Sequence, residues 1–250
     1  MTTNFMLLHG LPGHGDQWNK VARHLTGCTV TMPTFAGFET GHETVAFPST
    51  EIHAGQIVDW AARVPADDLT IVAWSFACHP LLFALTEMGL HARRVVFVEP
   101  SSDTYLDGDR KQRFLRSAEE VFTPVFTSMA QGAPFDLVEA VFRATGDEHS
   151  WTALGEDQKA LFRQSEGALR CAFTSGASPT AFAKERLAGT EVGDVDIVVT
   201  TQTRDMFRAA AEGLGELLPQ ARVHTIEGAN HMWPILQPAA FAEFLQALND

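Results

Sequence analysis

The chain has 250 residues, of which 45% are hydrophobic and 20% are charged, and its formal net charge is −13. These values are typical of a globular protein with one large domain, or with a core that carries an inserted subdomain. The negative charge repels phosphate backbones and anionic lipids, so we expect no nucleic-acid partner and no membrane partner. No apolar run in the sequence approaches the roughly 20 residues that a membrane span requires.

Cysteine content and the N-terminal residues indicate the compartment. The three cysteines, Cys28, Cys78 and Cys171, are odd in number and far apart. This argues against a disulfide framework and favours a reducing environment. The first residues carry no basic region of the kind that begins a secretory signal. We therefore expect a cytoplasmic protein.

Six short segments, apolar almost throughout, predict buried β-strands. They are Phe5–Leu8, Thr29–Met32, Leu69–Ala73, Val95–Val98, Asp196–Thr200 and Val223–Ile226. Longer helical patterns lie between them, and strands without an exposed face are typical of a parallel sheet. We therefore expect an α/β fold with a mostly parallel sheet and helices on both faces.

The first helical pattern lies between the first two of these segments. Trp18, Val21, Ala22 and Leu25 recur at the spacing of one helix face. Asp16 stands just before them, where an acidic side chain can cap a helix N-terminus. The sequence predicts an amphipathic helix that begins near Asp16.

Residues 101–189 break the alternation of strands and helices. Their helical patterns cover Arg110–Met129, Phe135–Ala144 and Gln158–Phe173. We expect a helical cap over 101–189, inserted in a core formed by residues 1–100 and 190–250. Ligands of open α/β sheets bind beyond the carboxyl ends of the strands, where such an insertion can cover the site. The alternative is that these helices pack on the edge of the sheet.

Ser75 follows a buried strand directly and precedes a helical pattern. A serine on so sharp a turn projects its hydroxyl from the sheet edge, and crowding there requires small residues two positions before and after it. Ala73 and Ala77 occupy these positions, so the motif is A-x-S-x-A in place of the usual G-x-S-x-G. Ser75 is a candidate nucleophile, and the alternative is a plain helix cap.

Two histidines stand at other strand ends. His9-Gly10 ends the first strand and opens a glycine-rich loop, whose backbone N–H groups can turn toward an anion. The spacing of His9, His14 and Asp16 matches no common zinc site, so we expect no metal. His231 follows the last strand in a loop, which is a suitable position for a catalytic base.

In this order, the His-Gly loop, the serine turn and the late histidine resemble the α/β-hydrolase superfamily over essentially the whole chain. The resemblance implies a serine hydrolase with a helical cap, in which Ser75 attacks a carbonyl carbon and His231 takes its proton. It also implies an oxyanion hole formed by the backbone N–H groups of Leu11 and Phe76. No cofactor is implied.

The resemblance leaves two candidates for the acid of a catalytic triad. Asp205 follows the strand after which the family usually places its aspartate, 26 residues before His231. Glu99 follows an earlier strand, from which lactonase-like members of the superfamily draw their acid. Asp205 is the first choice, and its carboxylate is then expected within roughly 2.6–3.2 Å of His231 Nδ1. Glu99 is the alternative.

These features predict hydrolysis of an ester, lactone or thioester of a hydrophobic small molecule through an acyl-serine intermediate. The residues beside the motifs are expected to contact the substrate: Gly10, Trp74, Met232 and Trp233. A carbon–carbon bond hydrolase or a lyase with the same triad remains an alternative. The altered serine turn leaves a further one, a ligand-binding protein without turnover.

Overall fold

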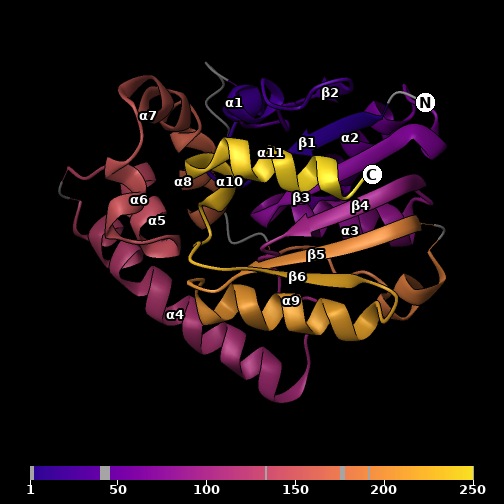
Figure 1. The fold of residues 1–250 in the computed structure, drawn as a ribbon. Coiled ribbons are helices and arrows are strands. Elements are labelled where there is room, and N and C mark those ends of the chain that lie inside the picture. The colour runs from indigo at the N-terminus through magenta and orange to yellow at the C-terminus, as the bar shows by residue number, and fades with distance from the viewer. Residues whose placement is uncertain (1–2, 40–45, 133, 175–177, 191, 250) are drawn as a thin grey trace.

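A six-stranded, all-parallel sheet forms the centre of the protein (Figure 1). The computed structural model describes residues 3–39, 46–132, 134–174, 178–190 and 192–249. The strands are β1 (Asn4–Leu8), β2 (Thr29–Thr31), β3 (Leu69–Trp74), β4 (Ala92–Val98), β5 (Val192–Thr200) and β6 (Arg222–Ile226). They are arranged in the order β2-β1-β3-β4-β5-β6. The prediction of a parallel α/β sheet is confirmed.

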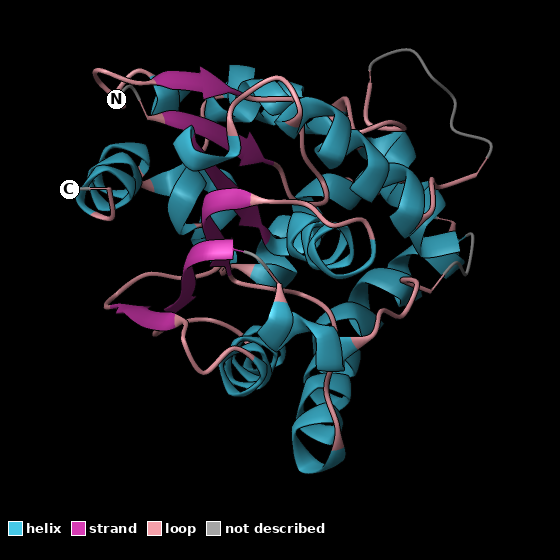
Figure 2. Cartoon of the chain, turned by 90° about the vertical axis from the view of Figure 1, so that its right-hand side faces the viewer, coloured by secondary structure: helices cyan, strands magenta, loops and turns pink. Residues whose placement is uncertain are grey.

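Helices cover both faces of this sheet (Figure 2). One face packs against α1 (Asn19–Ala22) and α11 (Pro238–Ala247), and the other against α2 (Thr50–Ala61), α3 (Cys78–Glu87) and α9 (Asp205–Leu217). Side chains that alternate along a strand enter opposite cores: Phe5 and Leu7 of β1 lie with α1 and α11, whereas Met6 and Leu8 lie with α2 and α3. Burial on both faces explains why the inner strands β1, β3 and β4 are apolar at most positions. The edge strands β2 and β6 are exposed or half-buried, so the expectation that all six strands would be buried was wrong for these two.

The predicted first helix begins differently from our expectation. A 3₁₀ turn, η1 (Gly15–Trp18), precedes α1, and His14 rather than Asp16 is the N-cap residue. His14 Nδ1 accepts a hydrogen bond from Asp16 N at 3.1 Å. Asp16 lies inside the first turn, so its assignment as the cap was wrong by two residues.

Between β4 and β5 the described residues form helices. They are α4 (Gly108–Gln131), α5 (Leu137–Thr145), α6 (Glu148–Thr152), α7 (Glu156–Arg163), α8 (Glu166–Thr174) and the 3₁₀ helix η4 (Lys184–Gly189). α5 to α8 gather beyond the end of the sheet to which the strand arrows point (Figure 1). The pattern over 158–173 is divided between α7 and α8 near Ser165, whose Oγ accepts a hydrogen bond from Gly13 N at 3.1 Å. This bond joins the helical segment to the loop after β1.

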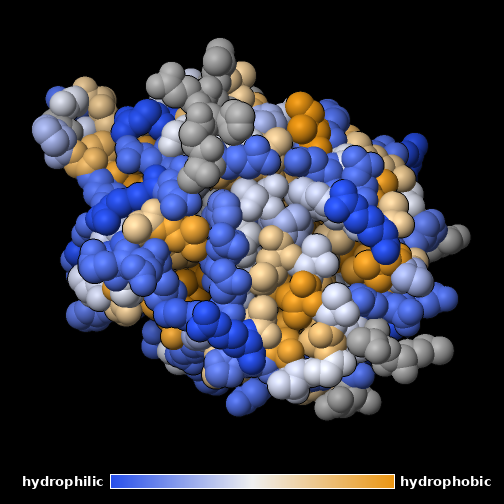
Figure 3. Space-filling view, turned by 90° about the horizontal axis from the view of Figure 1, so that it is seen from above, coloured by the Kyte–Doolittle hydropathy of each residue, from blue (hydrophilic) through white to orange (hydrophobic). Residues whose placement is uncertain are grey.

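The surface mixes hydrophilic and hydrophobic residues, as the view from above shows (Figure 3). Exposed large hydrophobic side chains include Ile52, Leu115, Phe126 and Val223. Single apolar side chains of this kind are ordinary on folded proteins. In the part of the chain that the structure describes, no helix has the length and apolar character needed to cross a membrane.

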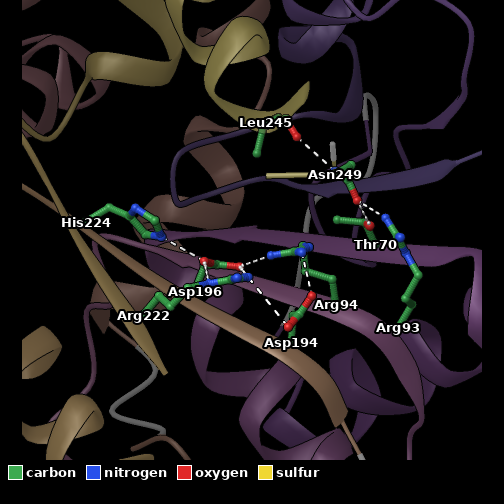
Figure 4. A network of polar contacts seen from close by, with 9 residues as sticks. All are labelled: Thr70, Arg93, Arg94, Asp194, Asp196, Arg222, His224, Leu245 and Asn249. Atoms are coloured by element: carbon green, nitrogen blue, oxygen red, sulfur yellow. Dashed lines mark hydrogen bonds and ion pairs between the residues drawn. The ribbon is translucent and has the colours of Figure 1, made fainter. Parts of the chain in front are cut away.

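An ion network centred on the buried Asp196 joins β4, β5 and β6 (Figure 4). Asp196 is fully buried and accepts hydrogen bonds from Arg94, from Arg222 Nε at 3.0 Å and from His224 Nε2 at 2.7 Å. Burial raises the pKa of Asp196, but the hydrogen bonds from Arg222, His224 and Arg94 outweigh burial and lower it. The network helps to fix the register of these three strands.

Replacement of Asp196 tests the contribution of this network. Asp196→Ala leaves the buried Arg94 guanidinium without its inner partner, so we expect a loss of about 3–5 kcal/mol in the free energy of unfolding at pH 7. Because the pKa of Asp196 is lowered in the folded state, its stabilisation is present above 3.8, the ordinary value, and is lost as the pH falls through the lowered value. Urea unfolding should therefore show the gap between wild type and variant narrowing in acid.

Asp194→Ala is the matched control, because Asp194 pairs with the same two arginines from a half-exposed position. We expect this variant to lose about 1 kcal/mol or less. Equal losses in the two variants would contradict the role given to Asp196.

Candidate active site

The carboxyl ends of parallel strands meet at one edge of the sheet, and three candidate residues meet there. Ser75 follows β3, Glu99 follows β4, and His231 lies in the loop after β6. Their side chains are buried, with 7%, 0% and 3% of each residue exposed, respectively. The topology therefore brings together residues that lie far apart in the chain.

Ser75 occupies a strained turn between β3 and the 3₁₀ helix η3 (Ser75–Ala77). Its φ of +55° is in the left-handed region, which residues other than glycine seldom adopt. Ala73 and Ala77 are completely buried on either side, which explains the need for small side chains there. Strained backbone of this kind is concentrated at functional sites, because it presents one side chain in a direction that a relaxed chain does not allow.

His231 connects Ser75 to an acid. Its Nε2 lies 3.1 Å from Ser75 Oγ, and its Nδ1 lies 3.2 Å from Glu99 Oε2. An ionised carboxylate only accepts hydrogen bonds, so Nδ1 carries the proton and Nε2 is left to accept from the serine hydroxyl. The ring also stacks on Phe207, with 3.8 Å between centroids and 12° between planes. Trp74 Nε1 donates to the His231 carbonyl at 3.1 Å.

Glu99 is held by donors from two further segments. Its Oε1 accepts hydrogen bonds from Thr200 N at 2.6 Å and from Thr200 Oγ1 at 2.9 Å. Its Oε2 accepts from the Thr203 hydroxyl as well as from His231. Glu99 also has a left-handed φ, +52°. A buried carboxylate with four donors is well compensated, and its direction is fixed.

Asp205 does not contact His231, so the expectation that it would lie there was wrong. It is the first residue of α9, and its carboxylate pairs with Arg113 of α4, at 2.6 Å from Nη2 and 3.1 Å from Nε. The hydrogen bond from Arg113 lowers the pKa of Asp205. The position after the strand was correct, but the start of the helix directs this side chain toward α4. The alternative candidate, Glu99, occupies the place expected for the acid.

The His9-Gly10 loop packs against the serine turn. His9 is completely buried, its Nε2 accepts from Phe35 N at 3.0 Å, and its Nδ1 donates to Gly10 O at 2.9 Å. Burial lowers the pKa of His9 to about 3, so this ring is neutral and acts as a structural bridge. A Cβ added at Gly10 would lie 3.4 Å from Ser75 Cβ, which shows how closely the loop approaches the serine. The oxyanion hole formed by Leu11 and Phe76 stays a prediction.

Three predicted substrate contacts belong to the protein core instead. Trp74, Met232 and Trp233 are at most 4% exposed and lie in the hydrophobic cluster beneath α1 and α11. Trp233 packs on Phe241, with 5.1 Å between ring centroids. Proximity in sequence to Ser75 and His231 did not reveal that these side chains point into the core.

A pocket of about 140 Å³ opens beside Phe76, the residue after the serine. It is lined by Phe47, Pro48, Ser49, Thr50, His53, Phe76, His79, Pro80, Ser101, Ser102, Ser178 and Pro179. These side chains come from four separate parts of the chain, so the sequence analysis missed most of them. The available signal was the position of His79, one helical turn beyond Ser75.

His79 is neutral in this pocket. Its Nε2 donates to Thr180 O at 3.0 Å, and its Nδ1 faces the hydroxyls of Ser102 and Thr104, each at 3.3 Å. Burial lowers the pKa of His79 to about 4. Among the described residues, no group of three or more His, Cys, Asp or Glu side chains is arranged to hold a metal ion.

Comparisons with solved structures agree with this architecture. A bromoperoxidase from Bacillus anthracis has a TM-score of 0.72 at 16% identity, over 100% of this chain and 93% of that one. The esterase RhEst1 from Rhodococcus sp. ECU1013 has a TM-score of 0.70 at 17% identity, over 99% and 90%. Est816, described as an N-acyl homoserine lactone degrading enzyme, has a TM-score of 0.69 at 15% identity, over 99% and 93%. At these identities the likeness shows the fold alone.

Sequence comparison gives a different kind of result. A search of curated proteins finds no match. The sequence model of the alpha/beta hydrolase family, however, matches residues 5–244, which is nearly the whole chain. The chain therefore belongs to the alpha/beta hydrolase family.

Proposed function

We propose that this protein is a cofactor-free serine hydrolase that cleaves an ester, lactone or thioester of a small hydrophobic molecule. The observation that carries the proposal is the continuous contact from Ser75 Oγ through His231 to Glu99, with distances of 3.1 and 3.2 Å. A serine hydroxyl is a weak nucleophile, and a neutral imidazole at hydrogen-bond distance is the group that can take its proton.

The chemistry follows from these roles. His231 Nε2 takes the proton of Ser75 as Oγ bonds to the substrate carbonyl carbon, and Glu99 stabilises the imidazolium that forms. The backbone N–H groups of Leu11 and Phe76 are assigned to the negative oxygen of the tetrahedral intermediate. His231 then protonates the leaving oxygen or sulfur, and the acyl group remains on Ser75. Water, deprotonated by His231, releases the acid and restores the serine.

The pocket beside Phe76 supports a compact, uncharged acyl group. Its volume of about 140 Å³ is close to that of a cavity that binds one benzene molecule, about 150 Å³. Phe47, Phe76 and Pro80 give it apolar walls. The larger groove of about 660 Å³ lies between α4, α5 and residues 203–205, and Ser75 does not line it. Ser75 does not line the smaller pocket either, but its chain neighbour Phe76 does, so the smaller pocket is the better match to the nucleophile.

Lactones deserve the first place in a substrate screen. The acid follows β4, the position from which lactonase-like members of the superfamily draw theirs. In a lactone the leaving oxygen stays tethered to the acyl group, so a single compact pocket can hold both parts of the substrate.

A fluorophosphonate probe tests the nucleophile directly. We expect Ser75 to be labelled in the wild-type protein and the label to disappear in Ser75→Ala, with ester hydrolysis reduced by several powers of ten. Intact-mass spectrometry measures the label, and circular dichroism checks that the variant is folded. A folded wild-type protein that is never labelled would favour the ligand-binding alternative.

The two acids give a paired test. Glu99→Gln removes the charge that stabilises the imidazolium, so we expect kcat to fall about 10⁴-fold. Asp205→Asn alters only the contact with Arg113, so we expect less than about a tenfold change and a stability loss below about 1 kcal/mol. Steady-state kinetics on one activated ester compares them. Equal effects, or a larger effect at Asp205, would contradict the assignment of Glu99.

The pocket predicts a preference for short acyl chains. On p-nitrophenyl esters from acetate to decanoate, we expect kcat/KM to be highest at about six carbons or fewer, because about 140 Å³ accommodates a group near the size of benzene. Phe47→Ala enlarges the pocket and should move the optimum to longer chains. Phe126→Ala, at an exposed position on α4, is the control and should leave the optimum unchanged. An optimum at decanoate in the wild-type protein would rule out this pocket as the acyl site.

A further inference from the structure

The turn between α5 and α6 contacts the loop that carries His231. Asn230 Nδ2 donates to Asp147 Oδ2 at 2.8 Å and lies 3.2 Å from Ser150 Oγ. The two segments are closely packed: a Cβ added at Gly146 would lie 3.0 Å from Met232 Cγ. The residues on either side of His231 are thus fixed against the helical segment.

The side-chain amide of Asn230 makes hydrogen bonds to two segments, the α5–α6 turn and the backbone just after His231. While Nδ2 binds the α5–α6 turn, Oδ1 accepts a hydrogen bond from Met232 N at 2.9 Å. Asn230 is only 7% exposed. Its amide therefore constrains the backbone on both sides of His231, and so the direction in which the imidazole leaves the chain.

Asp147 provides a rigid attachment point. It is the N-cap residue of α6, and its Oδ1 accepts from His149 N and from Ser150 Oγ, both at 2.9 Å. Burial raises the pKa of Asp147, but the hydrogen bonds from Ser150 and Asn230 outweigh it and lower the pKa. Asp147 is therefore ionised at neutral pH, and a hydrogen bond to a charged acceptor is stronger than one to a neutral acceptor.

The last turn of α5, just before the α5–α6 turn, also reaches the loop that holds Glu99. Arg204 Nε donates to Ala144 O at 2.8 Å. The preceding residue, Thr203, donates to Glu99 Oε2. The end of α5 and the turn after it thus contact both Asn230, beside His231, and Arg204, beside the Thr203 that donates to Glu99.

We propose that Asp147 and Asn230 are positioning residues, which hold His231 Nε2 against Ser75 from the helical segment. The inference rests on the proposed function, because it assigns them an effect on the activation of Ser75. Neither side chain contacts Ser75. Their removal should slow the reaction of Ser75 and leave KM for substrate nearly unchanged, since the pocket beside Phe76 is not disturbed.

The test measures the second-order rate of fluorophosphonate labelling at Ser75, which needs no knowledge of the substrate. We expect Asp147→Ala and Asn230→Ala each to reduce this rate by about 10- to 100-fold, as small misplacements of a catalytic group do. Asp147→Asn keeps one acceptor oxygen and should recover part of the rate. Because both residues act through one contact, the double variant should be no slower than the slower single variant.

Asp136→Ala is the matched control. Asp136 caps the neighbouring helix α5 through Glu139 N at 3.0 Å, and it does not contact the His231 loop. We expect its melting temperature to fall about as much as that of Asp147→Ala, while its labelling rate stays within about twofold of wild type.

Two results would overturn the inference while the proposed function stands. One is normal labelling of Asp147→Ala and Asn230→Ala beside a reactive wild-type protein. The other is a double variant whose loss is the product of the two single losses, which would show that the residues act independently. Failure of the wild-type protein to react would instead count against the proposed function.

Discussion

The buried carboxylate of Glu99 is the constraint on which the site depends. A carboxylate removed from water costs several kcal/mol unless donors surround it. The donors are Thr200 at the end of β5, Thr203 in the next loop and His231 after β6. Satisfying this one group therefore fixes the relative positions of three chain segments, and the imidazole is placed as part of the same arrangement.

Backbone strain also helps to fix the directions of the Ser75 and Glu99 side chains. Ser75 and Glu99 both have left-handed φ values, at the ends of neighbouring strands β3 and β4. Strain of this kind costs about 1–3 kcal/mol per residue and persists only where the surroundings determine the conformation. Here the surroundings are the buried central strands β3 and β4 of the sheet, which is stabilised at its opposite end by the Asp196 network. The stable part of the fold thus supports two unfavourable turns that aim Ser75 and Glu99, the proposed nucleophile and acid.

Much of the fold could be predicted from sequence because its strands and helices depend on local sequence patterns. Apolar strands, helical spacing and the small residues around Ser75 depend on near neighbours in the chain, and the sheet followed from them. The placement of Ser75 and His231 at strand ends also followed. Which carboxylate contacts His231 did not follow, because Asp205 pairs instead with Arg113, which lies 92 residues away in the chain. The pocket beside Phe76 could not be predicted for a similar reason, since the segments that line it come together only in the folded chain.

The most direct measurement of the central claim is a crystal structure of the protein after reaction with a small phosphonate. We expect phosphorus bonded to Ser75 Oγ, Glu99 against His231 Nδ1, and the phosphonyl oxygen within about 3.1 Å of the Leu11 and Phe76 backbone nitrogens. Such a structure would place the nucleophile, base, acid and oxyanion donors in one view. Phosphorus on another residue, or the carboxylate of Asp205 against His231, would contradict the account.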